Sequence, residues 1–123
     1  MGAHRLMQKV NQKQYGKKYS TTEQLTGDVW IDGKPIYRKV INIGTLPNAT
    51  TKSVAHGISN LETVIDIKGF YKEGTVYIPN VYVVPGTLSN GVRTYISGGN
   101  VNVSAGINRT GYSGYVIIEY TKT

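Results

Sequence analysis

Apolar and polar residues alternate along much of the chain after residue 18, with the period of two that is typical of β-strands. In residues 29–41 such alternation surrounds an Asp32-Gly33 pair, and Pro35 follows soon after. Asp-Gly favours a type I′ hairpin turn, in which both central residues have positive φ, and proline, which lacks an N–H, is tolerated at the start of a strand. The pattern predicts a first hairpin with its turn at Asp32-Gly33 and a return strand that begins at Pro35.

Later segments repeat the β pattern. They cover residues 63–71, 76–79, 81–84, 92–96, 101–103 and 114–121. Gly98-Gly99 predicts a second hairpin between two of them, while Asn90-Gly91 predicts a turn and residues 46–50 a loop. About eight short strands at this spacing indicate an all-β fold, namely an antiparallel β-sandwich of the jelly-roll or Ig-like kind.

The alternation also predicts which side chains share a face. Ile65, Ile67 and Tyr71 fall on one face of their strand and Asp66, Lys68 and Phe70 on the other; in the last strand Val116, Ile118 and Tyr120 share a face. One face of each strand is therefore expected to build the core.

The length of 123 residues favours one β domain, and the absence of cysteine excludes disulfides and thiolate metal sites. The net charge of +7 is uneven, because residues 1–18 hold five basic residues and no acidic one, whereas residues 19–123 hold nine basic and seven acidic residues. We therefore expect a short basic N-terminal arm, residues 1–18, before a nearly neutral head domain, residues 19–123. The arm is either a solvated tail or linker, or a segment that docks on nucleic acid or another acidic surface.

No apolar run approaches the ~20 residues of a membrane-spanning helix, and the first ten residues lack the apolar stretch of a secretory signal. No membrane insertion is expected.

The sequence offers little for catalysis. His4 and His56 lie far apart, and His56 is expected to be a hydrogen-bonded turn or strand-edge residue. The close carboxylate pairs are Asp28 with Asp32 and Glu62 with Asp66; the turn accounts for Asp32, and the second pair fits an exposed strand entry. Without a nucleophile elbow or a phosphate-binding glycine motif, we expect no catalytic residue, no metal and no cofactor.

Ten of the twelve aromatic residues are tyrosines, whose rings can stack on sugars and whose hydroxyls can bond to glycans or proteins. The strand residues Tyr37, Tyr82 and Tyr120, and also Trp30, are expected to pack in the core or at a subunit interface. For tyrosines near predicted turns, packing and ligand contact are equal alternatives; these are Tyr71, Tyr77, Tyr95 and Tyr112.

Five short segments carry a family resemblance in their order and spacing. They are YSTTEQ (19–24), WIDGKPIYRKV (30–40), Leu46-Pro47-Asn48, His56-Gly57-Ile58-Ser59-Asn60 and GYVIIEYTKT (114–123). Together they resemble the C-terminal β-rich modules of bacteriophage fibre proteins, whether tail fibres or head fibres. Residues 72–106 carry little of this family pattern.

The resemblance implies a virion component, assembled in the bacterial host cytoplasm, that forms a homotrimer at the tip of a fibre shaft and attaches the virus to a glycan or protein receptor on the host surface. It implies no enzyme activity and no nucleic-acid partner. The candidate ligand-binding residues are Tyr71, Tyr77, Tyr95, Asn100, Arg109 and Tyr112. The alternative is a purely structural trimerisation or capping domain of a phage fibre or virion protein.

Overall fold

The computed structural model describes residues 18–84 and 86–123, apart from the side chains of Val84, Thr87 and Leu88, and these residues form an all-β fold. The strands are β1 (Gln24–Val29), β2 (Pro35–Thr45), β3 (Thr51–Ala55), β4 (Leu61–Glu73), β5 (Val76–Pro79), β6 (Tyr82–Val84), β7 (Thr87–Ser97), β8 (Asn100–Ala105) and β9 (Ser113–Lys122). Of the predicted basic arm, residues 1–18, only Lys18 lies among the described residues. The described residues also contain no helix with the length and apolar character needed to cross a membrane.

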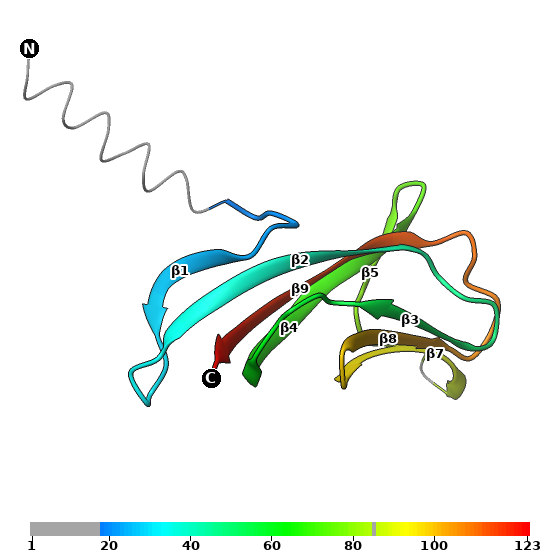
Figure 1. Ribbon diagram of the computed structural model, residues 1–123. Coiled ribbons are helices and arrows are strands. Elements are labelled where there is room, and N and C mark those ends of the chain that lie inside the picture. The colour runs from blue at the N-terminus through cyan, green and yellow to red at the C-terminus, as the bar shows by residue number, and fades with distance from the viewer. Residues whose placement is uncertain (1–17, 85) are drawn as a thin grey trace, which may run out of the picture.

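The strands form two antiparallel sheets, in the orders β1-β2-β9-β4-β5 and β3-β8-β7-β6. Figure 1 shows the second sheet packed beneath one end of the first, with the tip of the β1–β2 hairpin at the opposite end. The predicted antiparallel β-sandwich is therefore confirmed, with nine strands where about eight were expected.

Two of the four connections between the sheets, the one from β2 to β3 and the one from β8 to β9, run side by side. The Leu46 N–H donates to the Tyr112 carbonyl at 2.9 Å, and the Arg109 N–H donates to the Pro47 carbonyl at 3.1 Å. Because β2 pairs with β9 and β3 with β8, these neighbouring strands pass together from one sheet to the other, as strands do in jelly rolls.

The core lies between the sheets. Its most buried side chains are Ile41, Ile43, Leu46, Tyr71, Val92, Val101, Val103, Val116, Ile118 and Tyr120. The predicted inward face of the last strand is confirmed, since Val116, Ile118 and Tyr120 have no exposed surface. Burial of each large apolar side chain contributes about 1.5–3 kcal/mol.

The first hairpin has a different turn from the predicted one. The Gly33 N–H donates to the Trp30 carbonyl at 2.8 Å, and Gly33 has a φ of +84° while Asp32 does not have a positive φ. The turn therefore centres on Ile31 and Asp32 with Gly33 in the left-handed position, so the type I′ prediction is wrong. Pro35 does begin the return strand, as predicted.

Trp30 is half-buried and lies outside the core. Of the two roles predicted for Trp30, the core role is therefore wrong, because the second sheet does not extend to this hairpin (Figure 1). The other role, at a subunit interface, stays a prediction.

Two further local predictions are wrong, because strand pairing overrides the local sequence pattern. Asn90-Gly91 lies inside β7 rather than at a turn, and residues 51–55, where no strand was predicted, form β3 against β8. By contrast, Gly98-Gly99 makes the predicted hairpin, with Ser97 opposite Asn100.

His56 is a buried turn residue, as predicted. Its Nδ1 accepts the Ile58 N–H at 3.0 Å, so its Nε2 carries the proton and donates to the Gly98 carbonyl at 3.1 Å. The imidazole thus joins the loop after β3 to the β7–β8 turn, and both ring nitrogens are used for this purpose.

A substitution at Gly69 tests the close approach of β4 to β9. Its φ is +144°, and a Cβ there would lie 2.2 Å from the Tyr115 carbonyl oxygen. We expect Gly69→Ala to lower the free energy of unfolding by about 2–3 kcal/mol through backbone strain and overlap. Urea unfolding measures the change. The control is Gly99→Ala, where a Cβ meets no atom within 4 Å; equal stability of the two variants would contradict the β4–β9 register.

Tyr71 makes the stability of the fold depend on pH in the alkaline range. Burial raises the pKa of Tyr71 to about 12, and its hydroxyl donates to Thr94 Oγ1 at 2.7 Å, which donates in turn to the Asn80 carbonyl. This stabilisation is complete below the ordinary tyrosine pKa of about 10. Above it the unfolded chain ionises first, so we expect the free energy of unfolding to fall by about 1.4 kcal/mol per pH unit up to about pH 12.

Tyr71→Phe removes the ionising group, and we expect its stability to fall less steeply with pH than that of the parent. Denaturant unfolding at several values between about pH 9 and pH 11.5 gives the slope. Tyr77→Phe, at an exposed tyrosine, is the matched control and keeps the parental slope. Parallel pH profiles for the parent and Tyr71→Phe would contradict the assigned role.

Candidate functional site

The face of the five-stranded sheet that points away from the core, here called the outer face, carries two adjoining surface hollows. Strand register places its side chains in rows across the sheet, about 7 Å apart. Successive rows are Tyr77, Lys72 and Ser113; then Phe70, Tyr115 and Asn42; then Lys68, Ile117 and Val40; then Asp66, Glu119 and Arg38. The two middle rows are mainly apolar and aromatic, although they include Asn42 and Lys68, and the outer two rows carry further charged groups.

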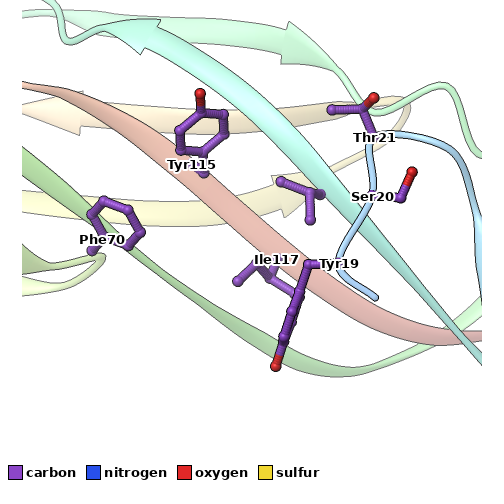
Figure 2. A pocket seen from close by; sticks show the side chains of 7 residues that line it. Tyr19, Ser20, Thr21, Phe70, Tyr115 and Ile117 are labelled. Atoms are coloured by element: carbon purple, nitrogen blue, oxygen red, sulfur yellow. The ribbon is translucent and has the colours of Figure 1, made fainter. Parts of the chain in front are cut away.

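The first hollow has a volume of about 380 Å³. It is lined by Tyr19, Ser20, Thr21, Val40, Phe70, Tyr115 and Ile117, most of which Figure 2 labels. In this view the segment that holds Tyr19, Ser20 and Thr21 crosses over the strands and brings the Tyr19 ring to Ile117 (Figure 2).

The second hollow, of about 340 Å³, adjoins the first, since both include Phe70 and Tyr115. It adds Asn42, Gly44, Lys72, Tyr77, Ser113 and Gly114. The Phe70 ring centroid lies 5.7 Å from that of Tyr77 and 6.3 Å from that of Tyr115, with tilted planes. We call the two hollows together the aromatic groove.

Three of the four aromatic rings of the groove are exposed, while Phe70 is half-buried. Tyr77 is 61% exposed, Tyr19 53% and Tyr115 43%. Tyr77 and Tyr115 stand on paired strands with a rigid backbone, so little backbone entropy is lost when they contact a partner; Tyr19 belongs to the segment before β1. The groove is consequently pre-formed for binding a flat, partly apolar molecule.

Residues 19–23, here called the strap, form one wall of the groove through Tyr19, Ser20 and Thr21 and are bonded to the sheet. The Val40 N–H donates to the Ser20 carbonyl at 2.9 Å, and Tyr120 donates its hydroxyl to Glu23 Oε1 at 2.5 Å. Burial is the main cause that raises the pKa of Tyr120, and the hydrogen bond to Glu23 raises it further. Lys122 also pairs with Glu23, with Nζ and Oε2 3.2 Å apart.

Cations hold the Tyr19 ring from one end of the groove. The Arg38 guanidinium carbon lies 4.5 Å from the ring centroid and Lys68 Nζ 5.8 Å from it. Arg38 also donates to Glu119 through Nε and Nη2, each at 2.8 Å. The cationic groups at this end of the groove are thus paired with Glu119 and with the Tyr19 ring.

Lys72 lies at the other end and has a different environment. Its Nζ lies 5.3 Å from the Tyr77 ring centroid, and no carboxylate of the described residues lies within 4.0 Å of it. Ser113 stands beside it on β9 in register. This end of the groove therefore combines an available cation with a hydroxyl and aromatic rings.

The structure does not bring the six predicted ligand-binding residues together. Tyr77 lies in the groove, but Tyr71 is fully buried and its hydroxyl is bonded to Thr94. The prediction that Tyr71 contacts a ligand is corrected, because its position in β4 turns the side chain inward toward Ile78 rather than outward with Phe70.

Tyr95 and Asn100 lie on the second sheet, away from the groove. The Tyr95 ring is half-buried, with the Arg93 guanidinium carbon 4.4 Å from its centroid. Asn100 is exposed beside the β7–β8 turn.

Arg109 and Tyr112 lie together in the connection before β9. The Arg109 guanidinium carbon lies 5.7 Å from the Tyr112 ring centroid and 5.6 Å from that of Tyr82, and Nη2 donates to the Asn90 carbonyl at 2.5 Å. Its Nε is buried and has no hydrogen-bond partner among the described residues. These contacts attach the connection to β6 and β7.

Sequence reasoning missed Tyr19, Phe70 and Tyr115 as groove residues. A signal existed for two of them, because Phe70 and Tyr115 alternate with the inward residues Tyr71 and Val116. Their meeting in space required the β4–β9 pairing, which local pattern does not give.

Two carboxylates of the outer face lie beside a cation. Asp66 and Glu119 are the carboxylates of the charged row, and both contact Lys68, whose Nζ lies 4.0 Å from one and 3.7 Å from the other. Within residues 18–84 and 86–123, no group of three or more His, Cys, Asp or Glu side chains could hold a metal ion.

Comparisons with protein-family models, with curated proteins and with solved structures found no match to this chain.

Proposed function

We propose that this protein is a non-enzymatic attachment module of a bacteriophage fibre, a virion component that acts as a homotrimer and binds a saccharide on the bacterial surface through the aromatic groove. The observation that carries the proposal is the cluster of the half-buried Phe70 ring with the exposed rings of Tyr77 and Tyr115 on one sheet face. The exposed Tyr19 ring of the strap lines the same groove. The sequence resemblance described above supplies the biological setting.

The chemistry of the groove suits a saccharide. The apolar C–H face of a sugar ring packs against an aromatic ring, while its hydroxyls need hydrogen-bonding groups nearby. Asn42 and Ser113 border the Phe70–Tyr115 pair and supply such groups. An apolar platform edged by polar groups favours a sugar over a wholly apolar ligand.

The charged row favours binding over cleavage. A glycosidase needs one carboxyl group kept protonated as a general acid beside a second, ionised one. Asp66 and Glu119 both face Lys68, and Arg38 further neutralises Glu119. Two carboxylates held by cations do not provide the required asymmetry.

The β1–β2 hairpin favours contact between copies of the chain. Leu25 is 58% exposed, Val29 65% and Ile31 91%, on a part of the first sheet that the second sheet does not cover (Figure 1). Apolar side chains gathered at a sheet edge are commonly covered by another subunit. A trimer would also present three grooves, and this avidity converts weak sugar contacts into firm attachment.

Removal of groove rings tests the binding role. We expect Tyr77→Ala and Tyr115→Ala each to weaken attachment about tenfold, because central aromatic contacts typically contribute more than 1 kcal/mol. The measurement is binding of the labelled protein to intact bacterial cells of several species and to arrays of capsular and wall polysaccharides.

Tyr95→Ala, on the second sheet, is the matched control and is expected to bind as the parent does. Circular dichroism establishes that each variant is folded. Parental attachment by both groove variants would overturn the proposal and favour the alternative of a purely structural trimerisation or capping domain.

The oligomeric state gives a separate test. We expect sedimentation equilibrium to give about three times the chain mass of 13.5 kDa. Ile31→Ser and Val29→Ser together are expected to shift the mass toward the single chain, since they remove apolar surface from the proposed contact between subunits. A monomer at micromolar concentration would contradict the trimer, and a trimer indifferent to both changes would place the contact elsewhere.

A further inference from the structure

The two ends of the aromatic groove differ in the polar groups they leave available. At the Tyr19 end, Arg38 and Lys68 face Glu119, and the Ser20 hydroxyl accepts the Thr22 N–H at 3.0 Å. These groups are occupied by protein partners. A ligand at this end meets mainly the apolar surfaces of Val40 and Ile117.

At the opposite end, Lys72 is placed between two potential ligand contacts. Strand register puts Tyr77 directly beside it on β5 and Ser113 directly beside it on β9. The side chain is exposed, and no carboxylate of the described residues pairs with it. By contrast, nearby Lys52 donates to the Thr45 carbonyl at 2.8 Å.

Lys72 lies in the row next to that of Phe70 and Tyr115 on the outer face. Lys72 and Phe70 are two residues apart on β4 and point to the same face, so their rows are separated by about 7 Å. A sugar ring stacked on Phe70 and Tyr115 can therefore direct a substituent toward the Lys72 ammonium. A charged substituent gains more from that contact than a neutral one, because charge-assisted hydrogen bonds are the stronger kind.

From these observations we infer that the Lys72 end of the groove selects an acidic saccharide, with a carboxylate or phosphate of the sugar bound at Lys72 and the sugar ring stacked on Phe70 and Tyr115. The inference rests on the proposed function and names the ligand class of the same groove. Lysine acts as a flexible point charge, so it accepts a carboxylate and a phosphate alike. The two sources of negative charge are distinguished by the probes below.

The experiment compares saccharides that differ only in charge. Isothermal titration calorimetry of the full chain uses an oligogalacturonate and its methyl-esterified form for the carboxylate, and phosphomannan fragments and the same fragments after dephosphorylation for the phosphate. We expect the charged member of at least one pair to bind about tenfold more tightly at about 0.15 M salt. We expect Lys72→Gln to abolish that difference and to leave binding of the uncharged member unchanged.

Lys34→Gln is the matched control, because Lys34 is also a surface lysine but pairs with Glu62, at 2.6 Å, outside the groove. It is expected to keep the parental preference. Retention of the preference by Lys72→Gln, or an equal loss in Lys34→Gln, would overturn the inference. Equal binding of charged and uncharged members would also overturn it while leaving the proposed function standing, whereas absence of binding to all four saccharides would count against both.

Discussion

The hydrogen bonding of β9 to both β2 and β4 is the interaction on which the rest of the structure depends. It joins segments that lie far apart in the sequence and places β9 at the centre of the five-stranded sheet. Its inward residues, Val116, Ile118 and Tyr120, form the middle of the core. Long-range pairing of this kind loses the entropy of closing large loops before stabilising contacts form. We therefore expect the pairing of this central strand to limit the folding rate.

The same strand also builds the surface that we consider functional. Because side chains alternate across a strand, the residues between the buried ones, Tyr115 and Ile117, must face outward. There they meet Phe70 of β4 and, beyond it, Tyr77 of β5, and the strap adds Tyr19. Core and groove are thus two faces of one sheet, and the rigidity that the core gives to the backbone is what fixes the spacing of the exposed rings. A binding surface on paired strands has less freedom to adapt than one on loops, and it is correspondingly better organised before a ligand arrives.

Local pattern was enough to predict the all-β class, the β7–β8 hairpin, the role of His56 and the inward face of β9, because each of these depends on neighbouring residues. It failed where distant strands decide the outcome. Asn90-Gly91 has the composition of a turn, yet pairing with β6 and β8 keeps it inside β7. Tyr71 was predicted as a contact residue from its nearness to a turn, although its own alternation with Phe70 already indicated an inward side chain. The groove was beyond local reasoning, since its residues come from the strap, β2, β4, β5 and β9, and only the sheet order brings them together.

We propose that the outer face of the five-stranded sheet is the surface with which this protein binds a bacterial surface saccharide. The most direct test is to record backbone amide NMR spectra of the protein while a bacterial surface polysaccharide to which it adheres, cut to short oligomers, is added. We expect saturable shifts in residues of the outer-face rows, centred on Phe70 and Tyr115 and extending to Asn42, with little change around Tyr95 and Asn100. Shifts confined to the second sheet, or to the Arg109 and Tyr112 connection, would contradict it.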